Sequence, residues 1–119
     1  FNFFGLTGCL NFYNVFFSGV SLSLQNGVCE DSLNIVNSSG ELKSIEIKNA
    51  YADAIDIDFS KISIKHLLIN NAGNDCMDLS GGEYQVEVLT AITCIDKGIS
   101  IGELSNFYLN FSYTSINRA

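Results

Sequence analysis

The chain of 119 residues is 47% hydrophobic, which gives it room for one domain with a continuous core. Its net charge of −7 makes nucleic acid and anionic membrane surfaces unsuitable partners, because phosphate groups bind clustered Lys and Arg. No stretch approaches the roughly 18–20 consecutive apolar residues of a membrane-spanning helix, so we expect no membrane insertion.

The residue types favour strands throughout the chain. Most apolar residues are β-branched or aromatic, and Pro, which cannot donate to a strand ladder, is absent. The sequence starts within a strand-like region, without Met or the pattern of a signal peptide. We therefore expect residues 1–119 to form a single β-helix domain that is a fragment of a longer chain.

The first predicted unit spans residues 8–38 and is a long coil, in which Val20, Leu22 and Leu24 alternate with polar residues. From residue 31 onward, one six-residue pattern returns every 22 residues. A repeat of this length is typical of stacked coils, each of which buries its apolar face against its neighbours. The three copies are Asp31-Ser32-Leu33-Asn34-Ile35-Val36, Asp53-Ala54-Ile55-Asp56-Ile57-Asp58 and Asp75-Cys76-Met77-Asp78-Leu79-Ser80.

Three further coils follow at residues 39–60, 61–82 and 83–104, and residues 105–119 begin another. Apolar residues alternate within each coil, which indicates strands rather than helices. Stacking the coils aligns their apolar side chains into continuous columns. These columns are Leu42/Ile64/Val86, Ile45/Leu67/Leu89, Ile47/Ile69/Ala91, Ala50/Ala72/Cys94 and Ile35/Ile57/Leu79/Ile101.

Clusters of Asn, Ser and Gly mark the corners between strands. Asn49, Asn71 and Thr93 share one corner column, and amide side chains stacked at about 4.8 Å can hydrogen-bond from coil to coil. The aspartate that begins each pattern returns one residue early at Asp96. This shift predicts a bulge or widened turn at Lys97-Gly98.

The four cysteines, Cys9, Cys29, Cys76 and Cys94, match no zinc-site spacing, since none form a Cys-x2-Cys pair and the chain has one His. We interpret them as buried free thiols. Disulfides would require Cα atoms within about 7 Å of each other, which the spacing does not establish.

Two carboxylate columns are the candidate functional residues. In the first, alternation places Ile55, Ile57 and Phe59 on one face of a strand and directs Asp56 and Asp58 to the other.

The 22-residue register stacks Asp78 beside Asp56, with Asn34 and Ser100 extending the column. Carboxylates one strand apart repel each other unless something neutralises them. Ca²⁺ can bridge them, one can hold a raised pKa and act as a general acid, or water and neighbouring polar groups can be enough. We therefore expect Asp56, Asp58 and Asp78 as ligand-binding residues, with Asp56 and Asp78 as the Ca²⁺ ligands.

The second column contains Asp31, Asp53, Asp75 and, after the shift, Asp96, each directly after a corner. Asp in this position commonly accepts hydrogen bonds from the backbone of its own turn. We interpret this column as a repeated turn cap, with an external cation ladder as the alternative.

The repeat length, the aligned aliphatic columns and the recurring aspartates resemble the right-handed parallel β-helix. The segments 53–60, 74–81 and 96–103 are similar to repeat regions of bacterial surface β-helix proteins, and the broader resemblance is to the pectate-lyase-like superfold. We therefore expect an all-β solenoid of about five coils. The resemblance further implies a polysaccharide partner and an extracellular or cell-surface location.

The enzymes of that superfold carry elements that this chain does not match. Polygalacturonase-like enzymes add a Gly-His-Gly element, whereas His66 stands between Lys65 and Leu67. Pectate-lyase-like enzymes need a basic residue as proton acceptor, and only Lys97 falls near the acidic columns, since Arg118 is close to the C-terminus.

We therefore favour a non-catalytic carbohydrate-binding or surface-interaction module and assign no catalytic residue. One alternative is a fragment of a polysaccharide lyase or glycoside hydrolase with a Ca²⁺-binding acidic column. The other is a purely structural repeat scaffold, in which every acidic residue serves solubility.

Open ends of a solenoid expose unpaired strand edges and apolar core. We expect these ends to meet flanking coils of a longer chain or another copy of the same chain, giving an end-to-end homo-oligomer. The aromatic residues placed there are Phe1, Phe3, Phe4, Phe107, Tyr108 and Phe111.

Overall fold

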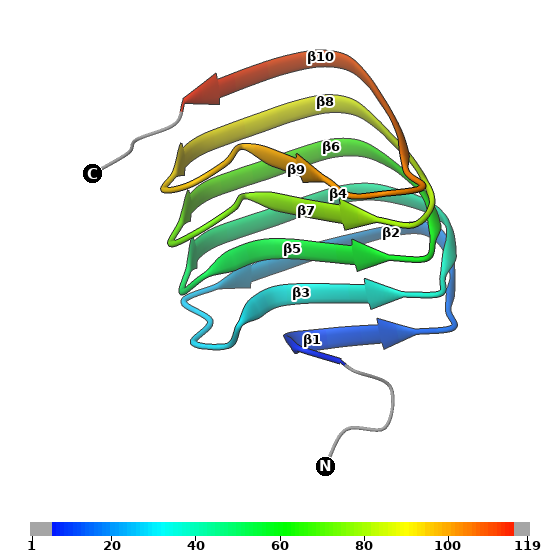
Figure 1. Ribbon diagram of the computed structural model, residues 1–119, viewed down its shortest axis with the longest axis horizontal. Helices are drawn as coiled ribbons and strands as arrows, with labels where there is room; N and C mark the ends of the chain where they lie inside the picture. Colours follow the sequence, from blue (N-terminus) through cyan, green and yellow to red (C-terminus); the bar gives the residue numbers. More distant parts are fainter. Residues whose placement is uncertain (1–5, 116–119) are drawn as a thin grey trace.

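The computed structural model describes residues 6–115 of the chain, with side chains described for residues 6–110. Ten strands form two parallel five-stranded sheets, and successive strands alternate between the sheets (Figure 1). The first sheet contains β1 (Gly8–Tyr13), β3 (Asp31–Val36), β5 (Asp53–Asp58), β7 (Met77–Ser80) and β9 (Ile99–Ile101). The second contains β2 (Phe16–Gln25), β4 (Ser39–Ala50), β6 (Lys61–Ala72), β8 (Glu83–Cys94) and β10 (Asn106–Ser115).

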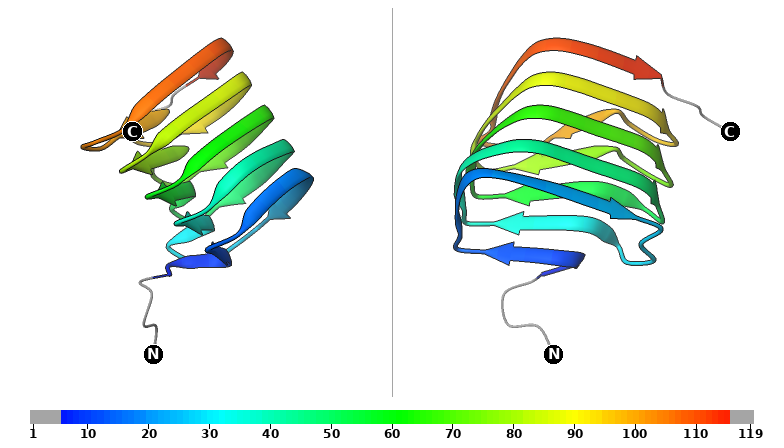
Figure 2. Two further views of the ribbon diagram at one scale, coloured as in Figure 1. Left: turned by 90° about the vertical axis from the view of Figure 1, so that its right-hand side faces the viewer. Right: turned by 180° about the vertical axis from the view of Figure 1, so that it is seen from behind.

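The chain is therefore a parallel β-helix of about five coils, which confirms the fold class expected from the sequence. Each coil contributes one strand to each sheet, so β1 and β10 lie at opposite ends of the stack (Figures 1 and 2). Within the described residues, no helix is long and apolar enough to cross a membrane.

The predicted apolar columns are the core of the solenoid. Ile57 pairs with Ile35 on one side and with Leu79 on the other, and all three side chains are fully buried. Leu42, Ile64 and Val86 align in the same way across the second sheet. The central coils keep a 22-residue register, so one apolar residue per coil at the same position is enough to continue each column.

The second sheet bends near its middle and wraps around two sides of the core (Figure 2). In β6, the buried residues fall at Ile62 and Ile64 and then, one position out of phase, at Leu67 and Ile69. The residue at the bend, Lys65, has no partner in the strand register on either side. The change of phase keeps the apolar side chains inward on both sides of the bend.

The corner after the second sheet is held by the predicted amide column. Asn49 and Asn71 both adopt positive φ, and each donates its Nδ2–H to the amide oxygen of the preceding Asn at 3.1 Å. The column starts at Asn26, and Thr93, also at positive φ, follows Asn71. Asn tolerates this left-handed conformation better than most residues, which explains its repetition here.

The opposite corner differs from the sequence expectation at Phe59. Alternation placed this ring with Ile55 and Ile57, but Phe59 adopts a φ of 52° and its side chain is 67% exposed. The left-handed turn ends the alternation one residue early and directs the ring outward. The ring then covers Gly81 of the next coil, where a Cβ atom would lie only 2.7 Å from it.

The predicted slip at Lys97-Gly98 is wrong. Ile99 pairs with Met77, so the 22-residue register continues, and Lys97 rather than Asp96 occupies the position equivalent to Asp75. The register irregularity of the described ladders falls instead in β2, between Ser18 and Ser21. Gly19, at a φ of 70°, lies within it.

The cysteines form two disulfides, Cys9–Cys29 and Cys76–Cys94, so the interpretation as free thiols is wrong. The Cα atoms are 5.4 Å apart in the first pair and 5.3 Å in the second. Cys76 and Cys94 belong to successive coils and come together because the corner turns both side chains into the core. The spacing of the cysteines along the sequence does not reveal this corner geometry.

The central apolar column gives a direct test of the fold. We expect Ile57→Ala to lower the free energy of unfolding by about 3 kcal/mol, because it leaves a cavity between Ile35 and Leu79. Ile101→Ala, at the 50%-exposed end of the same column, should cost about 1 kcal/mol or less. Urea denaturation followed by circular dichroism measures both. Equal losses for the two variants would contradict a continuous buried column.

Candidate functional site

The first carboxylate column lies on the outer face of the first sheet, as its register requires. Asp56 pairs with Asp78 in the neighbouring strand, and Asn34 and Ser100 continue the row. Asn34 donates its Nδ2–H to the backbone oxygen of Asp56 at 3.0 Å. Asp58 accepts a hydrogen bond from the hydroxyl of Ser80. The sequence prediction of which side chains stack here is therefore confirmed.

Burial and the repulsion between negative charges raise the pKa values of two carboxyls, Asp56 and Asp31. Burial raises the pKa of Asp56 to about 9, and the negative charges of Asp58, Asp31 and Asp78 add to the effect. Burial also raises the pKa of Asp31 to about 6, against a hydrogen bond from Thr7 that lowers it. The raised pKa favours the protonated form of Asp56 at neutral pH, which lowers the repulsion within the column.

The second carboxylate column joins neighbouring coils rather than capping its own turns. Asp53 Oδ1 accepts the backbone N–H of Asp75 at 3.0 Å and the side-chain amide of Asn74 at 2.8 Å. Asp75 Oδ1 in turn accepts the backbone N–H of Lys97 at 3.1 Å. For Asp53 and Asp75 the interpretation as own-turn caps is therefore wrong, because the corner directs both carboxylates toward the next coil.

One group of three carboxylates among the described residues could hold a metal ion. Oxygen atoms of Asp53, Asp75 and Asp78 all lie within 4.8 Å of one another. Hard cations such as Ca²⁺ take oxygen ligands of this kind. Asp78 is one of the ligands that the sequence suggested, but the geometry groups it with Asp53 and Asp75, whereas Asp56 lies outside this group.

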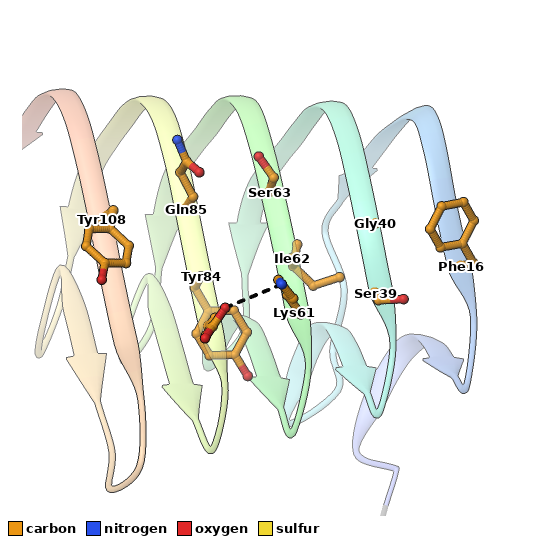
Figure 3. A pocket seen from close by; sticks show the side chains of 10 residues that line it. Phe16, Ser39, Gly40, Lys61, Ile62, Ser63, Tyr84, Gln85 and Tyr108 are labelled. Atoms are coloured by element: carbon orange, nitrogen blue, oxygen red, sulfur yellow. Dashed lines mark ion pairs between the residues drawn. The ribbon is translucent and has the colours of Figure 1, made fainter.

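A groove on the second sheet was not predicted from the sequence. It has a volume of about 360 Å³ and crosses the beginnings of the strands from β2 to β10 (Figure 3). Its walls are two rows of outward side chains, to which a coil contributes at most one residue per row. The first row contains Phe16, Ser39, Lys61 and Glu83, and the second contains Ser63, Gln85 and Tyr108.

The groove is polar in the middle and aromatic at both ends. Phe16 is 74% exposed and Tyr108 is 63% exposed, so both rings are accessible to a ligand. Between them, Lys61 Nζ lies 3.7 Å from Glu83 Oε2, so the central charges offset each other (Figure 3). Ser63 and Gln85 add a hydroxyl and an amide.

Tyr84 fixes the floor of the groove. Its side chain is buried, and its hydroxyl donates to the backbone oxygen of Ser80 at 2.7 Å and accepts the N–H of Ser60 at 3.3 Å. The hydroxyl reaches this point because residue 82 is glycine, where a Cβ atom would lie 2.8 Å from it. The hydroxyl thereby links three successive coils at the corner beneath the groove, which makes the groove a preformed surface.

His66 lies apart from the acidic columns. It is in β6 on the second sheet, in register with Ser44 and Val88, whereas Asp56 and Asp78 are on the first sheet. The single histidine therefore does not combine with these carboxylates into an acid–base pair.

The 22-residue repeat alone does not identify the groove residues, because Phe16 pairs with Ser39 and Tyr108 pairs with Gln85, each 23 positions away. Their identities vary from coil to coil, so no repeated motif marks them. Only the register brings Phe16 and Tyr108 to opposite ends of one surface.

Comparison of the chain with protein-family models, with curated proteins and with solved structures finds no match. The two carboxylate columns and the groove are therefore the features of this chain that bear on its function.

The buried carboxyls predict a stability that falls as pH rises. The folded-state pKa values of Asp31 and Asp56 lie above the ordinary 3.8, so the folded state binds these protons more tightly than the unfolded state. Their stabilising effect is full below about pH 4 and is lost for Asp31 toward pH 6 and for Asp56 toward pH 9. Each group contributes a slope of at most about 1.4 kcal/mol per pH unit.

Thermal melts between pH 4 and pH 9 measure this slope. Asp56→Asn should flatten it between pH 6 and pH 9, because the variant has no proton to lose there. Glu41→Gln, which changes an exposed carboxylate on the second sheet, should leave it unchanged. A melting temperature that rises across the range would contradict the assignment.

Proposed function

We propose that this chain is a non-catalytic carbohydrate-binding module that holds an extended, uncharged polysaccharide in the groove of its second sheet. The observation that carries the proposal is the groove itself, with exposed aromatic rings at its ends and paired or neutral polar groups between them. We also propose that the chain is related to bacterial surface β-helix proteins and to the pectate-lyase-like superfold.

The chemistry of the groove suits sugars. Ligand sites combine apolar contact area with a few placed polar groups that fix orientation. A pyranose offers an apolar ring face, which an aromatic side chain can cover, and a rim of hydroxyls. Ser39, Ser63 and Gln85 supply donors and acceptors to such a rim along the groove.

The charge distribution favours an uncharged polymer. Lys61 and Glu83 offset each other within the groove, so neither sign of ligand is preferred there. An anionic polymer would also meet a chain whose net charge is −7.

The placement of Asp56 argues against turnover of a polymer held in the groove. Its raised pKa suits a general acid, which is the observation in favour of the polysaccharide-active alternative. However, Asp56 lies on the first sheet, whereas the groove crosses the second. A polymer lying in the groove would not contact this carboxyl.

We also propose an extracellular or cell-surface location, which the two disulfides support. Disulfides persist in oxidising compartments and are rare where thiols are kept reduced.

The binding proposal is tested by filling the groove. We expect the unmodified chain to be retarded in native gels containing a neutral β-1,4-linked polysaccharide such as glucomannan or xyloglucan. Ser63→Trp should abolish the retardation, because a large side chain at the centre of the groove excludes the polymer. Lys65→Trp is the matched control, since it introduces the same side chain on the same strand outside the lining residues. Retardation of both variants equal to that of the unmodified chain would refute the groove as the binding surface.

End-to-end association remains a proposal, supported by the strand edges. Among the described strands, β2 and β10 each pair on one side only, and the same holds for β1 and β9. Phe107 is partly buried against the core and Tyr108 is exposed. Phe1, Phe3 and Phe4, and the side chain of Phe111, lie outside the described residues.

The association predicts a mass that grows with concentration. Light scattering across a dilution series should show multiples of 13.0 kDa, because an open parallel edge can accept another parallel strand. A single species of 13.0 kDa at the highest concentration reached would contradict the proposal.

A further inference from the structure

We infer that Phe16 and Tyr108 are the two end anchors of one binding site, so that its ligand is a linear uncharged oligosaccharide long enough to reach both. The inference rests on the proposed carbohydrate-binding function and adds the length, orientation and anchoring points of the ligand.

The two rings lie at opposite ends of the groove. Phe16 is on β2 and Tyr108 is on β10, and β4, β6 and β8 lie between them (Figure 3). Four strand spacings separate β2 from β10, which corresponds to about 19 Å along the solenoid axis. A ligand that covers both rings must therefore run across the strands.

Exposed rings line the groove only at these two ends. The intervening coils present Ser39, Lys61 and Glu83 in the row of Phe16, and Ser63 and Gln85 in the row of Tyr108. Tyr84 also lines the groove, but its side chain is 2% exposed and its hydroxyl is already hydrogen-bonded within the protein. Stacking surface is thus available at the ends and hydrogen-bonding surface in the middle.

This distribution sets a minimum length. In an extended β-1,4-linked chain, one sugar advances by roughly one strand spacing, so about five sugars are needed to cover both rings. A shorter oligosaccharide reaches one ring and the polar middle, and loses the second stacking contact.

The test is a titration calorimetry series with cello-oligosaccharides and manno-oligosaccharides, from disaccharides to octasaccharides. We expect the affinity to rise steeply near the pentasaccharide and then to level off. Phe16→Ala and Tyr108→Ala should each weaken hexasaccharide binding about tenfold, as expected for an anchoring aromatic residue. Each should leave disaccharide binding much less affected.

Matched variants separate stacking from folding. Phe16→Tyr and Tyr108→Phe keep a ring and should retain hexasaccharide binding. Tyr51→Ala removes a ring of similar exposure, 71%, from the opposite corner and should have no effect. Melting temperatures of all variants check that they remain folded.

The possible results separate the two-anchor inference from the proposed carbohydrate-binding function. Binding whose affinity is the same from the disaccharide upward would overturn the two-anchor inference and leave carbohydrate binding standing. Hexasaccharide binding unaffected by Phe16→Ala or by Tyr108→Ala would do the same. Absence of binding to every oligosaccharide in the series would overturn the proposed function and this inference together.

Discussion

The backbone ladder between successive coils is the constraint on which the rest of this structure depends. Each strand hydrogen-bonds in parallel to the strand about one coil earlier, so residues 22 positions apart become neighbours about 4.8 Å apart. A residue type that recurs at one position of successive coils therefore forms a continuous row along the solenoid. Aliphatic residues become a core, Asn becomes an amide column, and Asp becomes a set of repelling or shared charges. The groove is the same effect acting on outward positions whose residues differ.

The inward-facing columns could be predicted from the sequence because the buried positions carry apolar residues in every coil. The apolar column is recognisable because aliphatic residues recur at a fixed interval, at Ile35, Ile57 and Leu79. The acidic column is recognisable in the same way, from Asp56 and Asp78. The corners were less predictable. Phe59 turns outward because of a left-handed backbone conformation, and Cys76 meets Cys94 through a corner whose geometry periodicity does not encode.

The candidate sites differ in what the sequence could reveal. The acidic columns could be recognised in the sequence because carboxylates are conspicuous there. Which of these carboxylates point toward one another depends on side-chain direction. Asp53 and Asp75 turned out to receive backbone N–H groups of the next coil, a role in coil-to-coil bonding rather than in turn formation. The groove residues are ordinary in type, and only their joint position on the second sheet makes Phe16 and Tyr108 a pair.

The Cys76–Cys94 disulfide has a consequence for how the solenoid loses structure. Stacked repeats contact mainly their nearest neighbours, so such folds can fray inward from an end, one unit at a time. This bond links the coil of residues 61–82 to the coil of residues 83–104. Fraying that starts at β10 would meet a covalent crosslink after about one coil. Amide hydrogens of β5 and β6 would then exchange only through opening of the whole stack, whereas those of β10 would exchange by local release.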